Sequence, residues 1–224
     1  MSKHLQRDVD YLKQQLLLMG GMVEEATDLA INAVIDRRSD LAVQVQAGDD
    51  AIDAKELEIE DHCLKMLALH QPVATDLRFI ITALKVNNDL ERMGDLAKNI
   101  AERAAALCEQ PPIDGAQDFR RMAERVRWMV HECIDALVER DVDRARRVCL
   151  DDREVDEENR HRFAQLQEVM KRDPAYVERA VSLLSVSRHL ERIADHATNI
   201  AEDVVFLVDG EVIRHLRLAR ARAQ

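Results

Sequence analysis

Apolar positions recur with the spacing of α-helices along almost the whole chain, and no stretch alternates as a β-strand would. The pattern breaks near Arg38–Ser39, at Gln71–Pro72, in the linker 110–115 and at Asp173–Pro174. These breaks predict an all-α protein whose long helices run up and down through short connections. Helical segments are expected at about residues 5–37, 40–47, 49–69, 72–108, 117–140, 143–150, 152–171 and 174–208.

Glycine and proline refine these boundaries. The pair Gly20–Gly21 lies inside the first helix, where two glycines cost about 2 kcal/mol and can kink the helix. Gly48 is expected to end the short helix at residues 40–47. Pro72 is well placed as the first residue of the next long helix, because its missing N–H has no helical partner at that position.

One segment of the chain nearly repeats one hundred residues later. Asn88–Glu102 reads NDLERMGDLAKNIAE and Arg188–Glu202 reads RHLERIADHATNIAE, with nine of fifteen positions identical. A repeat of this length predicts a duplicated structural unit. The chain is therefore expected to form two tandem, pseudo-symmetric three-helix bundles, at residues 1–109 and 116–210, followed by a short tail at 211–224.

The repeated letters include a stripe of polar side chains. Because residues four apart lie one above the other on a helix, the acids and amides of each copy form a ladder of oxygens. These candidate ligands are Glu91, Asp95 and Asn99, with Glu102 beside them, and Glu191, Asp195 and Asn199, with Glu202 beside them. Apolar residues are expected on the opposite side, at Leu90, Met93, Ala97 and Ile100 and at Leu190, Ile193, Ala197 and Ile200.

The acidic ladders have two interpretations. The simpler one is a solvated surface, which is the usual role of a run of charges. Acids four apart repel each other by a few tenths of a kcal/mol, however, and this unfavourable spacing occurs twice at matching positions. Carboxylate and amide oxygens at that spacing suit a hard or borderline metal cation. A metal site on each ladder is therefore predicted.

A second pair of acids is expected near the first ladder. The turn near Gln71 joins two predicted helices as an antiparallel hairpin, so residues equally far from it lie level. The count places Asp49 and Asp53 level with about Met93 and Asp89. The aspartates are themselves four apart and would join the ladder acids as metal ligands.

The second half repeats this geometry. The turn near Asp173 brings Asp152 and Asp156 level with about Ala194 and Leu190. Four carboxylates from two helices can therefore meet in each half, enough for more than one metal ion. The alternative for the aspartates is that they begin their helices, since acids in a first turn stabilise the helix dipole.

Composition narrows the possible functions. The net charge of −11 argues against nucleic acid as a partner, and 47% hydrophobic residues allow a large core. The four cysteines form no CxxC pair, so they indicate neither a zinc site nor a thioredoxin-like motif. Scattered single thiols in a chain of this size indicate a reducing compartment. The start of the chain has no apolar signal core and no stretch is long enough to span a membrane. A cytoplasmic location is expected.

The sequence also resembles a known family. Gln71–Ala104, QPVATDLRFIITALKVNNDLERMGDLAKNIAERA, is similar to the signature of the PhoU family of phosphate-uptake regulators. His189–Gly210 is similar to that family's second signature, and the ExxxD pattern occurs once in each half. The Pro-Val-Ala-Thr-Asp-Leu-Arg sequence that begins the first signature has no close copy after Pro174.

The resemblance implies a cytoplasmic, non-enzymatic protein, often a homodimer, with metal bound on its acidic stripes. It implies a link between the ATPase subunit of a phosphate ABC transporter and a sensor histidine kinase, with negative regulation of the phosphate-starvation response. The metal is left open among iron, zinc, manganese and magnesium.

Two rival functions remain open. One is a carboxylate-bridged metal enzyme or ferritin-like iron store. Such a bundle needs two ExxH motifs, and Glu158–His161 supplies one. The other is a purely structural spacer.

Overall fold

The computed structural model describes residues 3–113 and 118–210. These residues form six α-helices, one short 3-10 helix and no strand. The predicted all-α class is confirmed. The elements in chain order are α1 (Lys3–Ile35), α2 (Ser39–His70), α3 (Ala74–Cys108), α4 (Arg120–Glu139), α5 (Val142–Arg172), η1 (Pro174–Tyr176) and α6 (Val177–Asp209).

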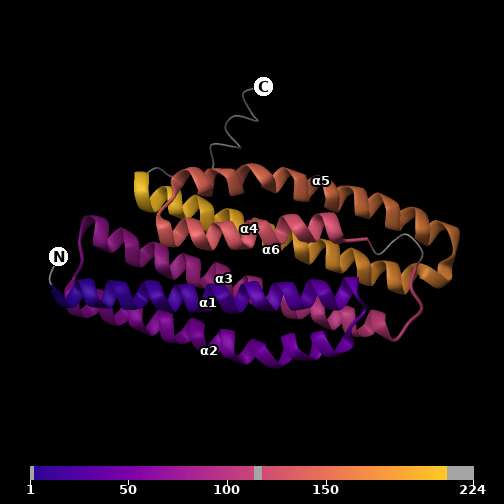
Figure 1. The fold of residues 1–224 in the computed structure, drawn as a ribbon, viewed down its shortest axis with the longest axis horizontal. Coiled ribbons are helices and arrows are strands. Elements are labelled where there is room, and N and C mark those ends of the chain that lie inside the picture. Colours follow the sequence, from indigo (N-terminus) through magenta and orange to yellow (C-terminus); the bar gives the residue numbers. More distant parts are fainter. Residues whose placement is uncertain (1–2, 114–117, 211–224) are drawn as a thin grey trace, which may run out of the picture.

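The helices form two three-helix bundles joined along their length. α1, α2 and α3 pack against one another, as do α4, α5 and α6, and the bundles meet through α3 against α6 and α1 against α4. Figure 1 shows α2 and α5 at the two outer edges, with the other four helices between them. This arrangement fits the predicted tandem bundles. The exact bounds 1–109 and 116–210 stay a prediction, and the tail 211–224 lies outside the described residues.

Two of the predicted helix breaks are wrong. The short helices expected at 40–47 and 143–150 are the first turns of α2 and α5, which continue without interruption. In α2, Val45 and Ile52 are both buried on either side of Gly48. Tertiary packing of this apolar stripe outweighs the roughly 1 kcal/mol that one glycine costs a helix. In α5, Val148 and Val155 are buried in the same way.

The glycine pair in α1 interrupts no helical turn, because α1 is one helix from Lys3 to Ile35. Gly20 is buried, and a Cβ placed on it would lie 3.1 Å from the side chain of Ile134 in α4. A Cβ on Gly21 would meet nothing within 4 Å. Gly20 therefore permits the close approach of α1 to α4, which joins the two bundles.

The connection between α2 and α3 also differs from the prediction. Pro72 lies in the turn, and α3 begins two residues later at Ala74. α2 ends at His70, and the left-handed backbone of the next residue, Gln71 (φ 44°), lets its N–H donate to the Leu67 carbonyl. The hairpin is thus centred near Pro72.

The residues predicted to lie opposite the acidic ladders form the centre of the core. All eight are at most 1% exposed: Leu90, Met93, Ala97, Ile100, Leu190, Ile193, Ala197 and Ile200. Their burial fixes the rotation of α3 and α6, so the ladder acids are held away from the centre. Within the described ranges, no helix combines the length and apolar character needed to cross a lipid bilayer.

Candidate metal centre

Carboxylates from α2 and α3 gather where these helices pack side by side. On α2, ligand oxygens of Asp49, Asp50 and Asp53 lie within 4.8 Å of one another. On α3, Glu91 and Asp95 are half-buried. Burial raises the pKa of Asp53, and the nearby charges of Asp49 and Asp95 raise it further. Acids from both helices therefore share one cluster, as the hairpin count predicted.

The register within this cluster differs from the prediction by about one helical turn at Asp49. The count expects Asp49 level with Met93, but its carboxylate contacts the Lys98 ammonium, further along α3. Nearer the turn the difference is small, because the Asn87 side chain donates to the Glu56 carbonyl at 3.0 Å. The difference between the predicted and the observed register thus grows with distance from the turn, as expected for two helices that cross at an angle.

As a result of this register, Glu56 joins the first cluster, although the sequence analysis did not select it. Burial raises the pKa of Glu56, with further contributions from Glu60 and Asp53. Burial also raises the pKa of Glu91, followed by the charges of Asp95, Glu56 and Asp53. Glu56 lies seven residues after Asp49, two helical turns away, and that spacing was the only signal in the sequence.

Basic side chains offset part of this negative charge. Arg92 lies 3.4 Å from Glu91 and 3.6 Å from Asp95, and Lys98 contacts Asp49. Arg92 is 54% exposed, so these contacts are screened by water. The pKa of Glu91 remains raised despite Arg92. The cluster therefore keeps excess negative charge that a cation would stabilise.

The second cluster lies at the matching place between α5 and α6. Asp152 and Asp156 face Glu191 and Asp195, and Thr198 Oγ1 donates to Asp152 Oδ1 at 3.3 Å. Burial raises the pKa of Asp195 to about 6, and the charges of Glu191, Asp152 and Asp156 add to this effect. The pKa of Glu191 is also raised, first by burial and then by Asp156. The predicted four carboxylates meet here as expected.

The two clusters differ at one matching position of the repeat. Lys98 in the first copy corresponds to Thr198 in the second, and they contact Asp49 of α2 and Asp152 of α5, respectively. The ammonium of Lys98 carries a full positive charge, whereas the hydroxyl of Thr198 is neutral. The first cluster therefore contains an internal cation that the second lacks at this position.

The helix-dipole explanation does not hold for the aspartates on α2 and α5. Asp49 and Asp152 each lie ten residues into their helices, because α2 begins at Ser39 and α5 at Val142. The N-terminal dipole acts only within the first turn. The helix dipole therefore does not account for their clustering.

The two ladder asparagines adopt different positions. Asn99 donates its side-chain N–H to the carbonyl of Asp95 at 2.8 Å, within α3. Asn199 instead donates across to Asp89 of the other bundle at 3.2 Å, and His196 Nδ1 lies 2.8 Å from the same carboxylate. Among the residues predicted beside the ladders, Glu102 is exposed but Glu202 is buried. The two ladders thus differ most at their C-terminal ends.

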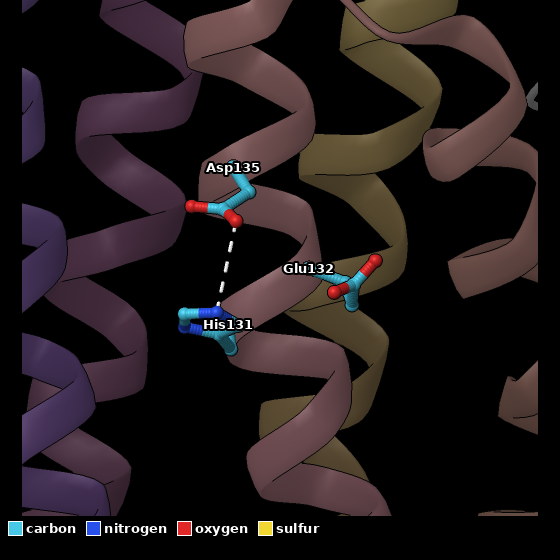
Figure 2. A group of neighbouring side chains, drawn as sticks. All are labelled: His131, Glu132 and Asp135. Carbon is cyan, nitrogen blue, oxygen red and sulfur yellow. Dashed lines mark ion pairs between the residues drawn. The ribbon is translucent and has the colours of Figure 1, made fainter.

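A further acidic group lies on α4. His131, Glu132 and Asp135 offer ligand atoms within 4.8 Å of one another. Figure 2 shows His131 and Asp135 facing each other, while Glu132 turns to another side of the helix. His131 Nε2 lies 3.6 Å from Asp135 Oδ2. Arg144 from α5 lies 2.7 Å from Asp135 and 3.3 Å from Glu132. The guanidinium offsets part of the charge of these acids, so this group is best described as an ion-pair network.

Two stretches of the chain match the family described as PhoU domain, at residues 16–104 and 119–204. Each stretch covers most of one bundle and contains one carboxylate cluster. The chain belongs to the PhoU family. The resemblance noted on the repeated ExxxD segments is therefore confirmed.

Individual PhoU relatives agree over nearly the full length. The chain is 40% identical over 225 residues to the phosphate-specific transport system accessory protein PhoU homolog of Pseudomonas aeruginosa, covering 100% of this chain and 93% of that protein. It is 41% identical over 209 residues to the Aquifex aeolicus protein of the same name, covering 93% and 95%.

Solved PhoU structures share the fold. The crystal structure of PhoU from Pseudomonas aeruginosa has a TM-score of 0.90 at 40% identity, over 92% of this chain and 99% of that one. The phosphate transport system regulatory protein PhoU from Streptococcus pneumoniae has a TM-score of 0.84 at 27% identity, over 93% and 98%. This chain therefore shares its overall fold with these two PhoU structures.

Proposed function

We propose that this PhoU protein is a non-enzymatic accessory protein of phosphate transport and a negative regulator of the phosphate-starvation response. Its relatives are named as accessory proteins of the phosphate-specific transport system, which supports the transport role. In this proposal it acts in the cytoplasm as an adaptor. It couples the ATPase subunit of a phosphate ABC transporter to a sensor histidine kinase and so maintains phosphate homeostasis.

The observation that carries the proposal is the pair of matching carboxylate clusters on a helical frame. Each cluster brings acids from two helices together at the edge of a bundle, and burial together with their mutual repulsion raises the pKa of Glu91 and of Glu191. A bound divalent or trivalent cation would relieve this repulsion and hold the two helices in one relative position. In this proposal the metal shapes a contact surface and takes part in no turnover.

Exposed aliphatic residues at matching positions support a role in protein contacts. Leu77 and Ile81 on α3 correspond to Val177 and Val181 on α6, and all four are more than a third exposed. At about 100° per residue, they lie on the same faces of the helices as the acidic ladders. Such surfaces suit a homodimer contact or contacts with the two proposed partners.

The adaptor role is tested by co-purification from phosphate-replete and phosphate-starved cells. The affinity-tagged protein is expected to recover the transporter ATPase, the histidine kinase or both, with a difference between the two conditions. The control is a tagged variant with Leu77→Asp and Val177→Asp, which leaves the carboxylate clusters intact. Recovery of neither partner in either condition would contradict the adaptor role.

Metal binding is tested separately by elemental analysis of the purified protein. The variant Glu91→Ala, Asp95→Ala, Glu191→Ala and Asp195→Ala is expected to lose most of its bound metal, because each cluster loses both of its ladder acids. The matched control removes exposed acids elsewhere, Glu124 and Glu178. Unchanged metal content in the quadruple variant would exclude these ladders as the site. Oxygen-dependent turnover of bound iron would instead favour an oxidase or iron store.

A further inference from the structure

An apolar groove of about 280 Å³ lies between α1 and α2, which run side by side in the first bundle (Figure 1). Most of its lining is apolar: Met22, Ala26 and Leu29 of α1, and Val45, Ala51 and Ile52 of α2. Sites that enclose small-molecule ligands usually have volumes of roughly 300–1,000 Å³, so this groove is slightly smaller than such a site. Its size suits a large side chain from another protein.

Gly48 of α2 keeps the groove open. A Cβ placed on Gly48 would meet nothing within 4 Å, and the residue is exposed. Gly48 lies inside a continuous helix and has no positive φ, so its backbone conformation does not require glycine. Glycine within a helix is destabilising relative to alanine. One role for glycine at such a position is to let a bound group approach the backbone closely.

The second bundle has a hollow of about 320 Å³ at the matching place, between α4 and α5. Arg37 and Arg140, with φ of 54° and 55°, follow α1 and α4 at matching positions. Asp49 and Asp152 lie equally far into α2 and α5. Counting from these two pairs gives the correspondences across the groove and the hollow: Met22 with Arg125, Glu25 with Trp128, Gly48 with Asp151, and Ala51 with Glu154. Three small or apolar positions are thus charged in the second bundle, where an indole replaces the glutamate.

In the second bundle, side chains of the chain itself cover the apolar floor of the hollow. Arg125 lies 3.0 Å from Asp151 and also pairs with Glu154. Trp128 lines the hollow beside them, half-buried and packed against the core. Val148 corresponds to a valine that lines the first groove, but it is fully buried and outside the lining of the hollow. An aromatic ring beside a guanidinium therefore completes the matching place.

The charges around the first groove favour a partner with a positive charge. Glu25 is exposed on its α1 wall, and residues 14–36 and 39–54 contain no lysine or arginine. Basic side chains that reach α1 and α2 from α3 and α4 contact other acids: Lys98 with Asp49, Arg127 with Asp28, and His131 with Glu24. A cation brought by a partner would complement Glu25 at the edge of an apolar site.

We propose that the groove between α1 and α2 binds a segment of a partner protein that presents an aromatic side chain beside an arginine or lysine. The aromatic group enters the groove over Gly48, and the cation pairs with Glu25. Aromatic and arginine side chains are the commonest anchors in the central pockets of protein interfaces. The inference goes beyond the proposed function and depends on neither the metal clusters nor the partners named there.

A groove-filling variant provides the first test. Gly48→Leu is expected to occupy the groove without displacing any neighbour, because a Cβ at this position has open space. The matched control is Gly21→Leu on α1, which also has open space but lies outside the groove lining. Both substitutions replace a helical glycine, so both proteins should fold and melt no lower than wild type.

The probe is a dye-labelled, alanine-rich helical peptide of about 18 residues. It carries one tryptophan with an arginine three residues before it, the spacing of Arg125 and Trp128. Fluorescence anisotropy in chelator should show equal binding to wild type and Gly21→Leu, and binding about tenfold weaker or more to Gly48→Leu. Replacing the peptide tryptophan with alanine should cause a similar loss. Equal affinity for wild type and Gly48→Leu, or no binding at all, would overturn the proposal.

The charge requirement is tested by a double-mutant cycle. Glu25→Gln should weaken the arginine peptide roughly threefold, as expected for an exposed ion pair, and should leave a peptide with glutamine in place of arginine unaffected. Equal effects on both peptides would show that Glu25 does not pair with the cation.

The second test makes no assumption about the peptide. Peptides displayed on phage are selected on wild-type protein after depletion on Gly48→Leu. The selected sequences should share an aromatic residue beside arginine or lysine, and acidic sequences or no shared pattern would contradict the proposed partner. Sedimentation velocity addresses a second copy of this chain as the occupant. A wild-type dimer that is lost in Gly48→Leu but kept in Gly21→Leu would overturn the proposal in favour of self-association.

Discussion

Replacing Asp195 with asparagine is expected to stabilise the metal-free protein at neutral pH and to weaken its cation binding. The pKa of Asp195 is about 6, above the usual 3.8. The folded state therefore favours the protonated carboxyl, and this contribution to stability is present below about pH 4 and lost as the pH rises through 6. Asparagine stays neutral and avoids the repulsion from Glu191, Asp152 and Asp156.

Chemical denaturation in the presence of a chelator, between pH 4 and 8, measures this effect. Relative to wild type, the Asp195→Asn variant should gain on the order of 1 kcal/mol in unfolding free energy on going from pH 4 to pH 7. This value is discounted because, although packing around the carboxyl raises its pKa, part of the Asp195 side chain reaches solvent. Divalent metal should stabilise the wild type more than the variant. Glu124→Gln, an exposed change outside the cluster, is the control. A pH-independent difference between the two proteins would show that Asp195 titrates normally.

Exchanging the residues at positions 98 and 198 is expected to exchange the cation affinities of the two clusters. Lys98→Thr removes the ammonium that contacts Asp49, and the first site should bind divalent cations about tenfold more tightly, equivalent to about 1.4 kcal/mol. Thr198→Lys places an ammonium beside Asp152 and should weaken the second site by a similar factor. Calorimetric titration of each single variant and of the double exchange measures these changes.

The Lys98→Thr variant should also show how cation binding is coupled to the stability of the fold. Asp49 is buried, so losing its cation should lower the unfolding free energy by about 2 kcal/mol in chelator. Added divalent metal should restore most of this loss, because it supplies the missing positive charge. Lys65→Thr, which removes an exposed ion pair with Asp61 on α2, is the control. Failure of metal to restore stability would mean that Lys98 serves packing alone.

The burial pattern of α3 and α6 was predictable because a helix has a fixed period. Once both segments were assigned as helices, Met93 and Ile193 had to point away from the ladder acids, and both are fully buried. The repeat likewise predicted that each bundle would carry one acidic cluster. These conclusions depend only on spacing along a single helix, which the sequence contains directly.

The relative positions of different helices were less predictable. The hairpin count correctly placed the acids of α2 near those of α3. It expected Asp49 to lie level with Met93, but Asp49 contacts Lys98, further along α3. A small change in the turn or in the lean of a helix shifts its neighbour by a full turn. For this reason the count missed Glu56, and it gave no sign that Asn199 would bond to Asp89 of the other bundle.

The predicted helix boundaries at Gly48 and before Asp152 were wrong for a related reason. Local propensity favours a break at a glycine beside two aspartates, but buried Val45 and Ile52 hold that stretch in α2. Long-range packing contributes several kcal/mol where a glycine costs about 1 kcal/mol. Because α2 and α5 continue through these positions, Asp49 and Asp152 lie in the middle of helices, where the helix dipole does not account for them.

By itself, the sequence determined the all-α class, the duplication and which face of α3 and α6 carries the acids, because each follows from residue spacing within one helix. Only the tertiary structure decided which acids meet across helices, that Lys98 and Thr198 make the clusters unequal, and that Phe79 lines a small apolar cavity. Those features depend on the register and angle between packed helices. Many side chains set these quantities together, and no single segment of the sequence specifies them.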